Sequence, residues 1–517
     1  MRRSVPGVLL ALLTTAGCGT TVPLTTTQGS VVGDGLGAVA IAVPNEVAGA
    51  PGIPGAAVGT VKGGSIARAT GNAPDAALQT GGADTAPVVP VAPGDAGRGV
   101  SATTLTIGVV YQANLDAANR AVGGGAITSG DQLAEVHLLV KDINSRGGIA
   151  GRKLAVDTFA YDAQSSQPYA VQDQAACAHF SQDVAVFAVV GAGSTSTFQE
   201  CMDKAGTAVI GADIVRFDGQ DLKRYPHYFD VQQMDLDRLV RALATELSEN
   251  GWATGWNTTL GRPATTKAKV GVVGFDQPRY TRAVKTGLVP ELRRRGFTVA
   301  DADVVLVNEP TGQADIGQAA AQVQNAVLRF AQDGVTHVVL LDTHGGITQV
   351  FLNAADSQRY YPRYGMESGS GTQALLDGGI IRTNQLRGAR GLGWIPSLDL
   401  PSASNPDNGK WSSDDRRACI ALMKAGGQSF ASTNAESIAL LYCDQFGLLD
   451  RALDTITTPT LVAFTAAVEG LGARAPRASL GAASYGPGKH VGVARGIEWA
   501  FDEGCNCMTY GRARTLT

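Results

Sequence analysis

A run of small and hydroxyl-bearing residues at positions 191–197 follows an apolar segment and precedes a stretch of helical character. It contains Gly193 and the hydroxyl residues Ser194, Thr195 and Ser196. The start of a helix leaves backbone N–H groups without intrahelical partners, and together with the hydroxyls these groups favour an anion such as a carboxylate. The competing interpretation is that the hydroxyls only cap the helix, although a cap needs one such residue. We therefore expect this segment to bind an anionic group of a ligand.

Three more candidate residues, Tyr111, Asp213 and Asp342, come at or just after the ends of other apolar runs. A carboxylate at Asp213 favours a cationic group on a ligand, but such a residue can equally bond its own backbone in a turn. Tyr111 is either a ligand contact or an aromatic residue of the core. Because parallel sheets place their binding residues at the carboxyl ends of strands, we treat all three as candidate contacts.

The spacing of the cysteines favours disulfides. Besides Cys18 the chain has six, in the pairs Cys177/Cys201 and Cys419/Cys443, both 24 positions apart (201 − 177 and 443 − 419), and Cys505/Cys507. No CxxC or His-rich spacing suggests zinc, so we expect disulfides formed in an oxidising compartment. The alternative is six unrelated buried thiols. Whether the last pair joins stays open, because so tight a ring strains the bridge.

The chain lacks the short motifs of the common catalytic classes. It has no G-x-S-x-G elbow, no P-loop, no H-E-x-x-H and no dinucleotide-binding G-x-G-x-x-G after the first apolar strand. The formal net charge is −4, and the basic run at positions 293–295 is too short for the basic face that nucleic acid requires. We therefore expect no enzymatic activity, cofactor, bound metal or nucleic-acid partner.

The first 18 residues have the character of an export signal. Arg2 and Arg3 precede a short apolar run at positions 8–13, and the segment 15–18 ends in small residues and Cys18. The run is far too short to span a bilayer. The ending resembles a bacterial lipoprotein box, so we expect residues 1–18 to be a signal peptide and Cys18 to carry a lipid on the outer face of the cell membrane. Thr15 stands where Leu is usual, which leaves plain cleavage as the alternative.

Residues 19–100 are mostly Gly, Ala, Val, Pro, Thr and Ser, with few charges and almost no large side chains. Such a composition cannot build a packed core, so we expect a disordered linker. A flexible coil of this length spans on the order of 50 Å. That reach suits a domain held away from a membrane surface.

After residue 100, apolar runs alternate with segments of helical periodicity. The runs lie at positions 105–110, 154–160, 185–190, 207–210, 270–273, 304–307 and 335–341. This alternation predicts an α/β fold with parallel sheets covered by helices on both faces. There are more strands than one sheet comfortably holds, so we predict two lobes, with the ligand at the carboxyl ends of their strands.

Residues 144–151 resemble the Asn-x-x-Gly-Gly-Ile-x-Gly signature of type I periplasmic binding proteins, the leucine/isoleucine/valine-binding and related receptors of ABC transporters. The glycines suit a left-handed helix end and a tight turn. Further matching segments follow in the order of that family, at positions 161–165, 190–196, 273–280, 364–369 and 441–444. The resemblance therefore extends from about residue 105 almost to the end.

The resemblance implies two Rossmann-like lobes with parallel sheets, joined by a three-strand hinge. Residues 101–231 with 394–487 would form the first lobe, and residues 232–393 with 488–517 the second. The pair Cys177/Cys201 matches the position of a disulfide in the amino-acid-binding members.

The resemblance also implies ligand contacts. Ala212 and Asp213 lie where the first lobe meets the ligand, although Asp213 departs from the family's small hydroxyl residue. Tyr280 matches an aromatic residue that the second lobe places on the ligand; otherwise it is a core residue at helical spacing. Glu367 lies where amino-acid-binding relatives place a carboxylate for the α-ammonium, and a buried carboxylate opposite an ammonium gives each charge a partner.

The function implied is that of a solute-binding protein that closes around a small polar ligand and delivers it to an ABC permease. The ligand would be a branched-chain or other amino acid, or an amide or related metabolite. We expect a lipid-anchored monomer. The alternative is a ligand-sensing receptor domain of the same fold that is not coupled to transport. An envelope enzyme is disfavoured by the missing motifs.

Overall fold

The computed structural model describes residues 97–121, 128–191, 193–211, 215–254, 268–343, 345–401 and 411–516. The predicted signal peptide, Cys18 and most of the predicted linker lie outside the described residues, as do Ala212 and Asp213. The last residues of the predicted linker, 97–100, are among the described residues. Gly97 donates its backbone N–H to the Pro459 carbonyl (2.9 Å), and Val100 is buried, so these residues pack on the first lobe.

The first lobe contains a five-stranded parallel sheet in the order β2-β1-β3-β4-β5. Its strands are β1 (Thr104–Ala113), β2 (Lys153–Asp162), β3 (Ala188–Val190), β4 (Ala208–Gly211) and β5 (Tyr228–Asp230). Alternate residues of a strand point to opposite faces, and here both faces are buried. In β3, Val190 packs into the larger core of the molecule, whereas Val189 packs into a separate cluster with Phe180 and Phe198. Burial on both faces explains the continuous apolar runs of the sequence.

The second lobe contains a seven-stranded sheet in the order β12-β11-β10-β9-β8-β6-β7. Its strands are β6 (Val270–Phe275), β7 (Val304–Val307), β8 (His337–Leu340), β9 (Arg363–Glu367), β10 (Arg390–Gly393), β11 (Arg495–Asp502) and β12 (Cys507–Thr515). β6 to β10 pair in parallel, and the hairpin of β11 and β12 adds two antiparallel strands at one edge. The predicted α/β class with parallel sheets is thus confirmed.

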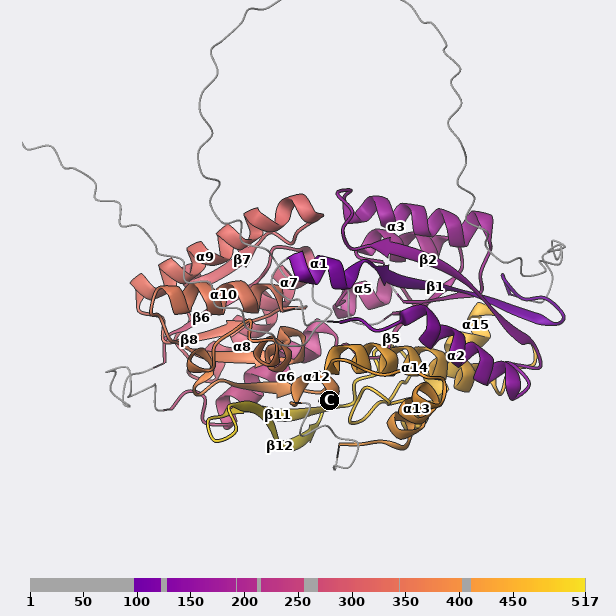
Figure 1. Cartoon of the computed structure of the whole chain (residues 1–517). Helices are drawn as coiled ribbons and strands as arrows, with labels where there is room; N and C mark the ends of the chain where they lie inside the picture. The colour runs from indigo at the N-terminus through magenta and orange to yellow at the C-terminus, as the bar shows by residue number, and fades with distance from the viewer. Residues whose placement is uncertain are drawn as a thin grey trace, which may run out of the picture.

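Helices cover the sheets of both lobes, which lie side by side in Figure 1. Those of the first lobe are α1 (Leu115–Ala121), α2 (Gln132–Ser145), α3 (Tyr169–Ala178), α4 (Ser196–Lys204), α5 (Gly219–Arg224), α13 (Asp414–Ala425), α14 (Thr433–Leu453) and α15 (Leu461–Gly470). Those of the second lobe are α6 (Leu236–Glu249), α7 (Pro278–Arg282), α8 (Val289–Arg294), α9 (Ile316–Asp333), α10 (Gly346–Ser357), α11 (Thr372–Asp377) and α12 (Pro396–Asp399). Among the described helices, none is both long and apolar enough to cross a membrane.

The chain passes between the two sheets three times, and the three passages are bonded to one another. The first follows β5, the second follows β10, and the third precedes β11. Asp230 donates its N–H to the His490 carbonyl (2.9 Å) and accepts from the Gly492 N–H (2.7 Å). The Trp394 indole N–H donates to the Gln232 carbonyl (2.9 Å). These bonds join the passages into the three-strand hinge that the resemblance implied.

The Asn-x-x-Gly-Gly segment joins α2 to β2. The Asn144 side chain donates to the Leu154 carbonyl (2.9 Å) and accepts from its N–H (2.7 Å), which fixes the end of the helix against the strand. Gly148 has φ +83°, and a Cβ there would lie 1.9 Å from the Arg152 carbonyl oxygen. A side chain at this position is therefore excluded, because the turn is both left-handed and tight.

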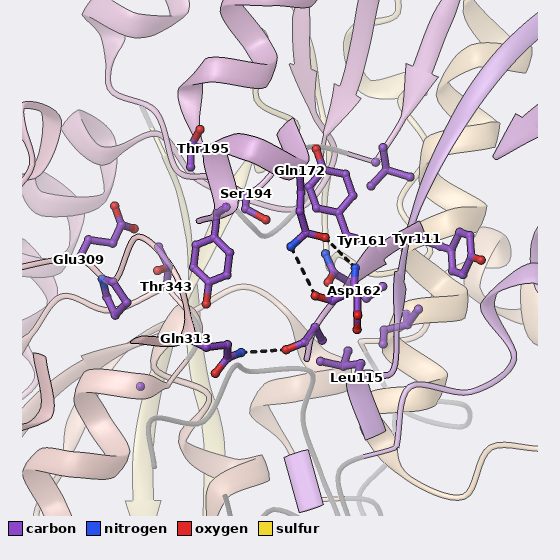
Figure 2. A pocket seen from close by; sticks show the side chains of 18 of the residues that line it. Tyr111, Leu115, Tyr161, Asp162, Gln172, Ser194, Thr195, Glu309, Gln313 and Thr343 are labelled. Carbon is purple, nitrogen blue, oxygen red and sulfur yellow. Dashed lines mark hydrogen bonds between the residues drawn. The ribbon is translucent and has the colours of Figure 1, made fainter. Parts of the chain in front are cut away.

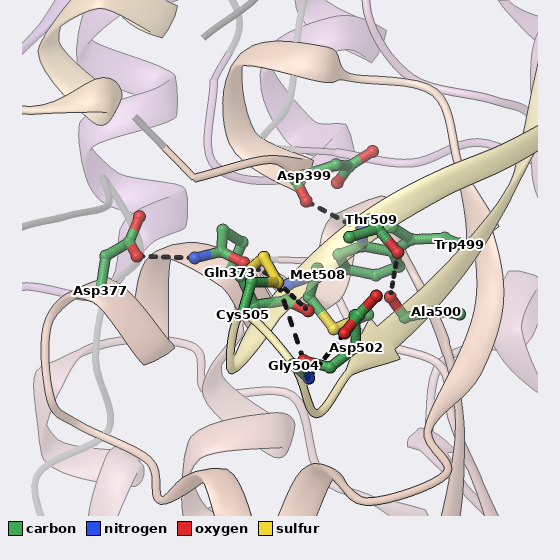
Figure 3. The surroundings of a disulfide bond; sticks show 11 residues. Gln373, Asp377, Asp399, Trp499, Ala500, Asp502, Gly504, Cys505, Met508 and Thr509 are labelled. Atoms are coloured by element: carbon green, nitrogen blue, oxygen red, sulfur yellow. Dashed lines mark hydrogen bonds between the residues drawn. A yellow bond between two sulfur atoms is a disulfide. The ribbon is translucent and has the colours of Figure 1, made fainter. Parts of the chain in front are cut away.

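All six cysteines of the described part form disulfides: Cys177–Cys201, Cys419–Cys443 and Cys505–Cys507. The first joins α3 to α4 and the second joins α13 to α14. The third closes the tip of the β11–β12 hairpin, where Figure 3 shows it beside Asp502 and Gly504. The pairing that the sequence left open is therefore present in the structure.

Candidate functional site

The candidate site is a cavity of about 250 Å³ between the two lobes, shown in Figure 2. The first lobe lines it with the carboxyl ends of β1, β2 and β3 and the loops that follow them. The second lobe contributes the residues that follow β6, β7 and β8, and one side of α14 completes the wall. The cavity therefore lies where open α/β sheets place their ligands.

Most of the wall is apolar or aromatic. Tyrosine rings come from the carboxyl ends of β1 and β2, from the start of α3 and from α14, and the second lobe adds a phenylalanine and an isoleucine. The apolar and aromatic lining residues are Val110, Tyr111, Leu115, Tyr161, Ala163, Tyr169, Phe275, Pro310, Ile316, Ile438, Leu441 and Tyr442. Tyr111 thus lies where the sequence placed it. Such a wall suits a ligand with an apolar body, because burial of apolar surface drives its binding.

The β3–α4 loop lines the cavity with Ser194 and Thr195, but its backbone donors already hold a carboxylate of the protein itself. The Ser194 and Thr195 N–H groups donate to the two oxygens of Asp173 (2.8 and 2.9 Å), and the Thr195 hydroxyl donates to it as well. The Tyr161 hydroxyl adds a further bond (2.8 Å). We expected this loop to bind an anionic group of a ligand. In the structure, the anionic group that it binds is the buried carboxylate of Asp173 in α3.

Two neighbouring candidates of this loop, Gly193 and Ser196, do not line the cavity. A Cβ on Gly193 would lie 2.5 Å from the Asp173 carboxylate and 2.3 Å from the Phe198 Cβ, so the glycine permits the close approach. Ser196 is the first residue of α4, and Thr195 caps the helix by accepting from the Thr197 N–H (3.1 Å). Burial raises the pKa of Asp173, and its hydrogen bonds act in the opposite direction.

Three carboxylates line the cavity, and each has a partner. Asp162 accepts from Asn114 (2.9 Å), and this bond lowers the pKa of its carboxyl group. Glu309 pairs with Arg279 (3.5 Å). The predicted candidate Asp342 does line the cavity, but it accepts the backbone N–H groups of Thr343 and Thr348 (both 2.8 Å) at the start of α10. These contacts assign structural partners to all three groups.

Glutamine side chains supply most of the remaining polar lining, and the sequence analysis missed them. They are Gln112, Gln132, Gln172, Gln277, Gln313 and Gln445. Gln445 of α14 is almost fully buried, and its Nε2 donates to the Ile210 carbonyl (2.9 Å). Its Oε1 has no hydrogen-bond partner among the described residues. The signal that could have found it is the spacing of positions 438, 441, 442 and 445, which share one helix face.

Glu367 does not line the cavity, and its carboxylate already has a cationic partner. It lies in β9, fully buried, and binds the Arg216 guanidinium through both oxygens (3.1 and 3.2 Å). Arg216 precedes α5 of the first lobe, so the pair bridges the two lobes. Arg216 also donates to Gln233 (2.7 and 3.1 Å) and to the Asp342 carbonyl (3.1 Å). A guanidinium of this chain thus stands where the resemblance placed a ligand's ammonium.

Tyr280 also lies behind the cavity wall. It is fully buried, and its ring packs edge to face on Phe275, with ring centroids 5.5 Å apart. Phe275 lines the cavity, so Tyr280 positions a lining residue. Burial raises the pKa of its hydroxyl group. Ala212 and Asp213 lie outside the described residues, so their predicted contacts stay predictions.

The lobes touch across the cavity mouth. The Tyr169 N–H of the first lobe donates to the Thr311 carbonyl of the second (2.7 Å), and Gln313 Nε2 donates to the Ala163 carbonyl (2.8 Å; Figure 2). Arg282 of α7 pairs with Asp218 at the start of α5 (2.6 Å). The lobes are therefore closed around the cavity. No cluster of side chains that could hold a metal ion occurs within the described ranges.

Comparisons with known proteins identify the fold. No family model and no curated protein sequence matches the chain. A substrate-binding protein of an ABC transporter from Desulfitobacterium hafniense, solved in complex with Leu, superposes with a TM-score of 0.51 at 16% identity, over 79% of this chain and 100% of that one. A solute-binding protein from R. palustris in complex with 4-hydroxybenzoate gives a TM-score of 0.55 at 12% identity, over 80% and 97%. A fatty acid ABC transporter substrate-binding protein from Thermomonospora curvata gives 0.52 at 13%, over 81% and 94%.

These likenesses, at 12–16% identity, concern the fold of the two α/β lobes. The chain thus has the fold of type I periplasmic binding proteins, as the signature at residues 144–151 and the segments after it predicted. The three relatives are substrate-binding proteins of ABC transporters.

Proposed function

We propose that this protein is an extracytoplasmic solute-binding protein that captures a small molecule between its two lobes and delivers it to an ABC permease. The observation that carries the proposal is the closed cavity at the carboxyl ends of both sheets, lined from both lobes. A ligand held this way stabilises the closed state, because it contacts both lobes only when they meet. The permease would then recognise that state.

The proposal includes an anchor. Lipidation of Cys18, followed by the predicted linker, would hold the binding lobes at a distance from the outer face of the membrane. Cys18→Ala should move the protein from the membrane fraction into the soluble or secreted fraction. Retention of the variant in the membrane fraction would refute the anchor without affecting the binding proposal.

The binding proposal is tested by enrichment of small molecules from an extract of the source organism, followed by mass spectrometry. Ser194→Trp places a large ring in the cavity wall and should abolish the enrichment. As a control, Val462→Trp introduces the same ring at a residue of α15 that is 75% exposed. This variant should enrich the same compounds as the wild type. If the wild type and Ser194→Trp enrich the same compounds equally, the cavity is not the binding site.

A second candidate function is a ligand-sensing receptor domain without transport. The two differ in the phenotype of a deletion strain. Transport predicts that the strain loses uptake of the radiolabelled compound recovered by enrichment, and that the full-length gene restores it. Unchanged uptake, together with loss of a transcriptional response to the compound, would favour sensing.

A further inference from the structure

We infer that the molecule bound in the interlobe cavity is uncharged and largely apolar, and that it donates a hydrogen bond to Gln445 Oε1. This inference rests on the proposed function and specifies its ligand class. It departs from the amino acid that the sequence led us to expect, because the protein itself fills the positions for both charged ends of an amino acid.

The position for a ligand carboxylate is filled by Asp173. Its two oxygens take the backbone N–H groups of Ser194 and Thr195, the Thr195 hydroxyl and the Tyr161 hydroxyl. A second carboxylate placed at this loop would meet the charge of Asp173 and would find these donors already used. None of the described lining residues is Lys or Arg, so the described wall offers no cation in compensation.

The position for a ligand ammonium is filled by Arg216. Its guanidinium binds Glu367 through two contacts, and both side chains have no exposed surface. Gly369 leaves room for this pair, since a Cβ there would lie 2.4 Å from the Arg216 Nη2. The carboxylates that do line the cavity are bonded to Asn114, to Arg279 and to the start of α10. No described lining carboxylate is therefore left without a partner for a ligand cation.

One face of α14 lines the cavity with mostly apolar and aromatic groups. Ile438, Leu441, Tyr442 and Gln445 recur at helical spacing and all line the cavity. The Tyr442 hydroxyl donates to Gln132 Oε1 (3.0 Å), so its hydrogen is used within the protein. Asn434 of the same helix also lines the cavity, and its Nδ2 donates to the Thr128 carbonyl (2.9 Å). This face therefore offers apolar surface, an aromatic ring and two amides, of which Gln445 has a buried oxygen without a partner among the described residues.

The orientation of the Gln445 amide follows from its neighbour. The Ile210 carbonyl can only accept, so the group that faces it at 2.9 Å must be the Nε2 of Gln445. The Oε1 then faces the other way, buried and without a partner among the described residues. A buried acceptor without a partner is costly, and a hydroxyl or amide N–H of a ligand would remove that cost.

The test determines the charge at pH 7 of the compounds that the wild type enriches and Ser194→Trp does not. A neutral compound with a hydroxyl or N–H donor and an apolar body is the expected result. A free amino acid or another carboxylate would overturn the inference and leave the proposed function intact. If no compound is enriched by the wild type over Ser194→Trp, both the inference and the proposed function fail.

The contact with Gln445 is tested by calorimetry with the enriched compound. Gln445→Met keeps the length of the side chain and removes the acceptor, so Kd should rise about tenfold or more. Gln318→Met makes the same change at an exposed position of α9 and should leave Kd unchanged. Far-ultraviolet circular dichroism confirms that both variants fold. An unchanged Kd in Gln445→Met would overturn the assignment of this acceptor.

Discussion

The pair of Arg216 and Glu367 gives a prediction that separates a structural role from a ligand-binding role. Glu367→Gln keeps the shape of the side chain and removes its charge, which leaves the buried guanidinium of Arg216 without its anionic partner. Both side chains have no exposed surface and meet through two contacts of 3.1 and 3.2 Å. Removing one partner of a buried pair costs about 3–5 kcal/mol, because the other charge stays desolvated.

The same geometry predicts that the two residues are coupled. Arg216→Met also removes the donors to Gln233 and to the Asp342 carbonyl, so it should destabilise the protein at least as much as Glu367→Gln. The double variant leaves neither charge of this pair buried without its partner. Its loss of stability should therefore be smaller than the sum of the two single losses, by about 2 kcal/mol or more.

Urea unfolding followed by tryptophan fluorescence measures these free energies. Trp394 is a local probe, since the Arg216 guanidinium lies 5.6 Å from the centre of its ring. If Glu367 instead served the ammonium of a ligand, Glu367→Gln would be as stable as the wild type, and the effects of the two substitutions would simply add. That result would refute the assignment of Arg216 as the partner of Glu367.

Three further predictions concern buried groups of the first lobe. Asp173→Ala removes the acceptor of several buried donors and should cost about 3 kcal/mol or more; formate should restore part of this loss in the variant and not in the wild type, as thermal unfolding will show. Burial, with a smaller effect of Asp131, raises the pKa of Glu135 from 4.5 to about 8. The stability contributed by its protonated form is therefore present below about pH 4.5 and lost as the pH rises through 8. Glu135→Gln, neutral at every pH, should reduce the decline in unfolding free energy between pH 5 and pH 8 by about 3–4 kcal/mol; equal decline in both proteins would contradict the shift. Replacing Cys177 and Cys201 by serine should cost about 3 kcal/mol in urea unfolding, because their bridge closes a long loop of the unfolded chain, and an unchanged midpoint would show that the bridge does not form.

The secondary structure could be predicted closely where the sequence pattern is local. The apolar run at 304–307 coincides with β7, and the run at 270–273 lies within β6. The left-handed helix end predicted from the glycines of residues 144–151 is also present, with Gly148 at φ +83°. The short range of these signals explains the success, since capping and periodicity depend on neighbouring residues.

The candidate site could be predicted only in part, because its partners lie far apart in the sequence. The loop at Ser194 was located from its composition and position. Its donors, however, are used by Asp173, 21 residues before Ser194, and nothing local announces that bond. Glu367 and Arg216 are separated by 151 residues. The sequence does not distinguish Gln445 from the other glutamines. The packing of α14 on the first lobe places its side chain against Ile210 of β4.

Hydrogen–deuterium exchange with and without the compound recovered by enrichment tests the central claim most directly. If a small molecule binds in the closed interlobe cavity, amides of both lobes should gain protection together. These lie after β1 and in the β3–α4 loop of the first lobe, and after β7 in the second. The hairpin tip at Cys505–Cys507 should not change. Protection confined to one lobe, or located away from these segments, would contradict the account.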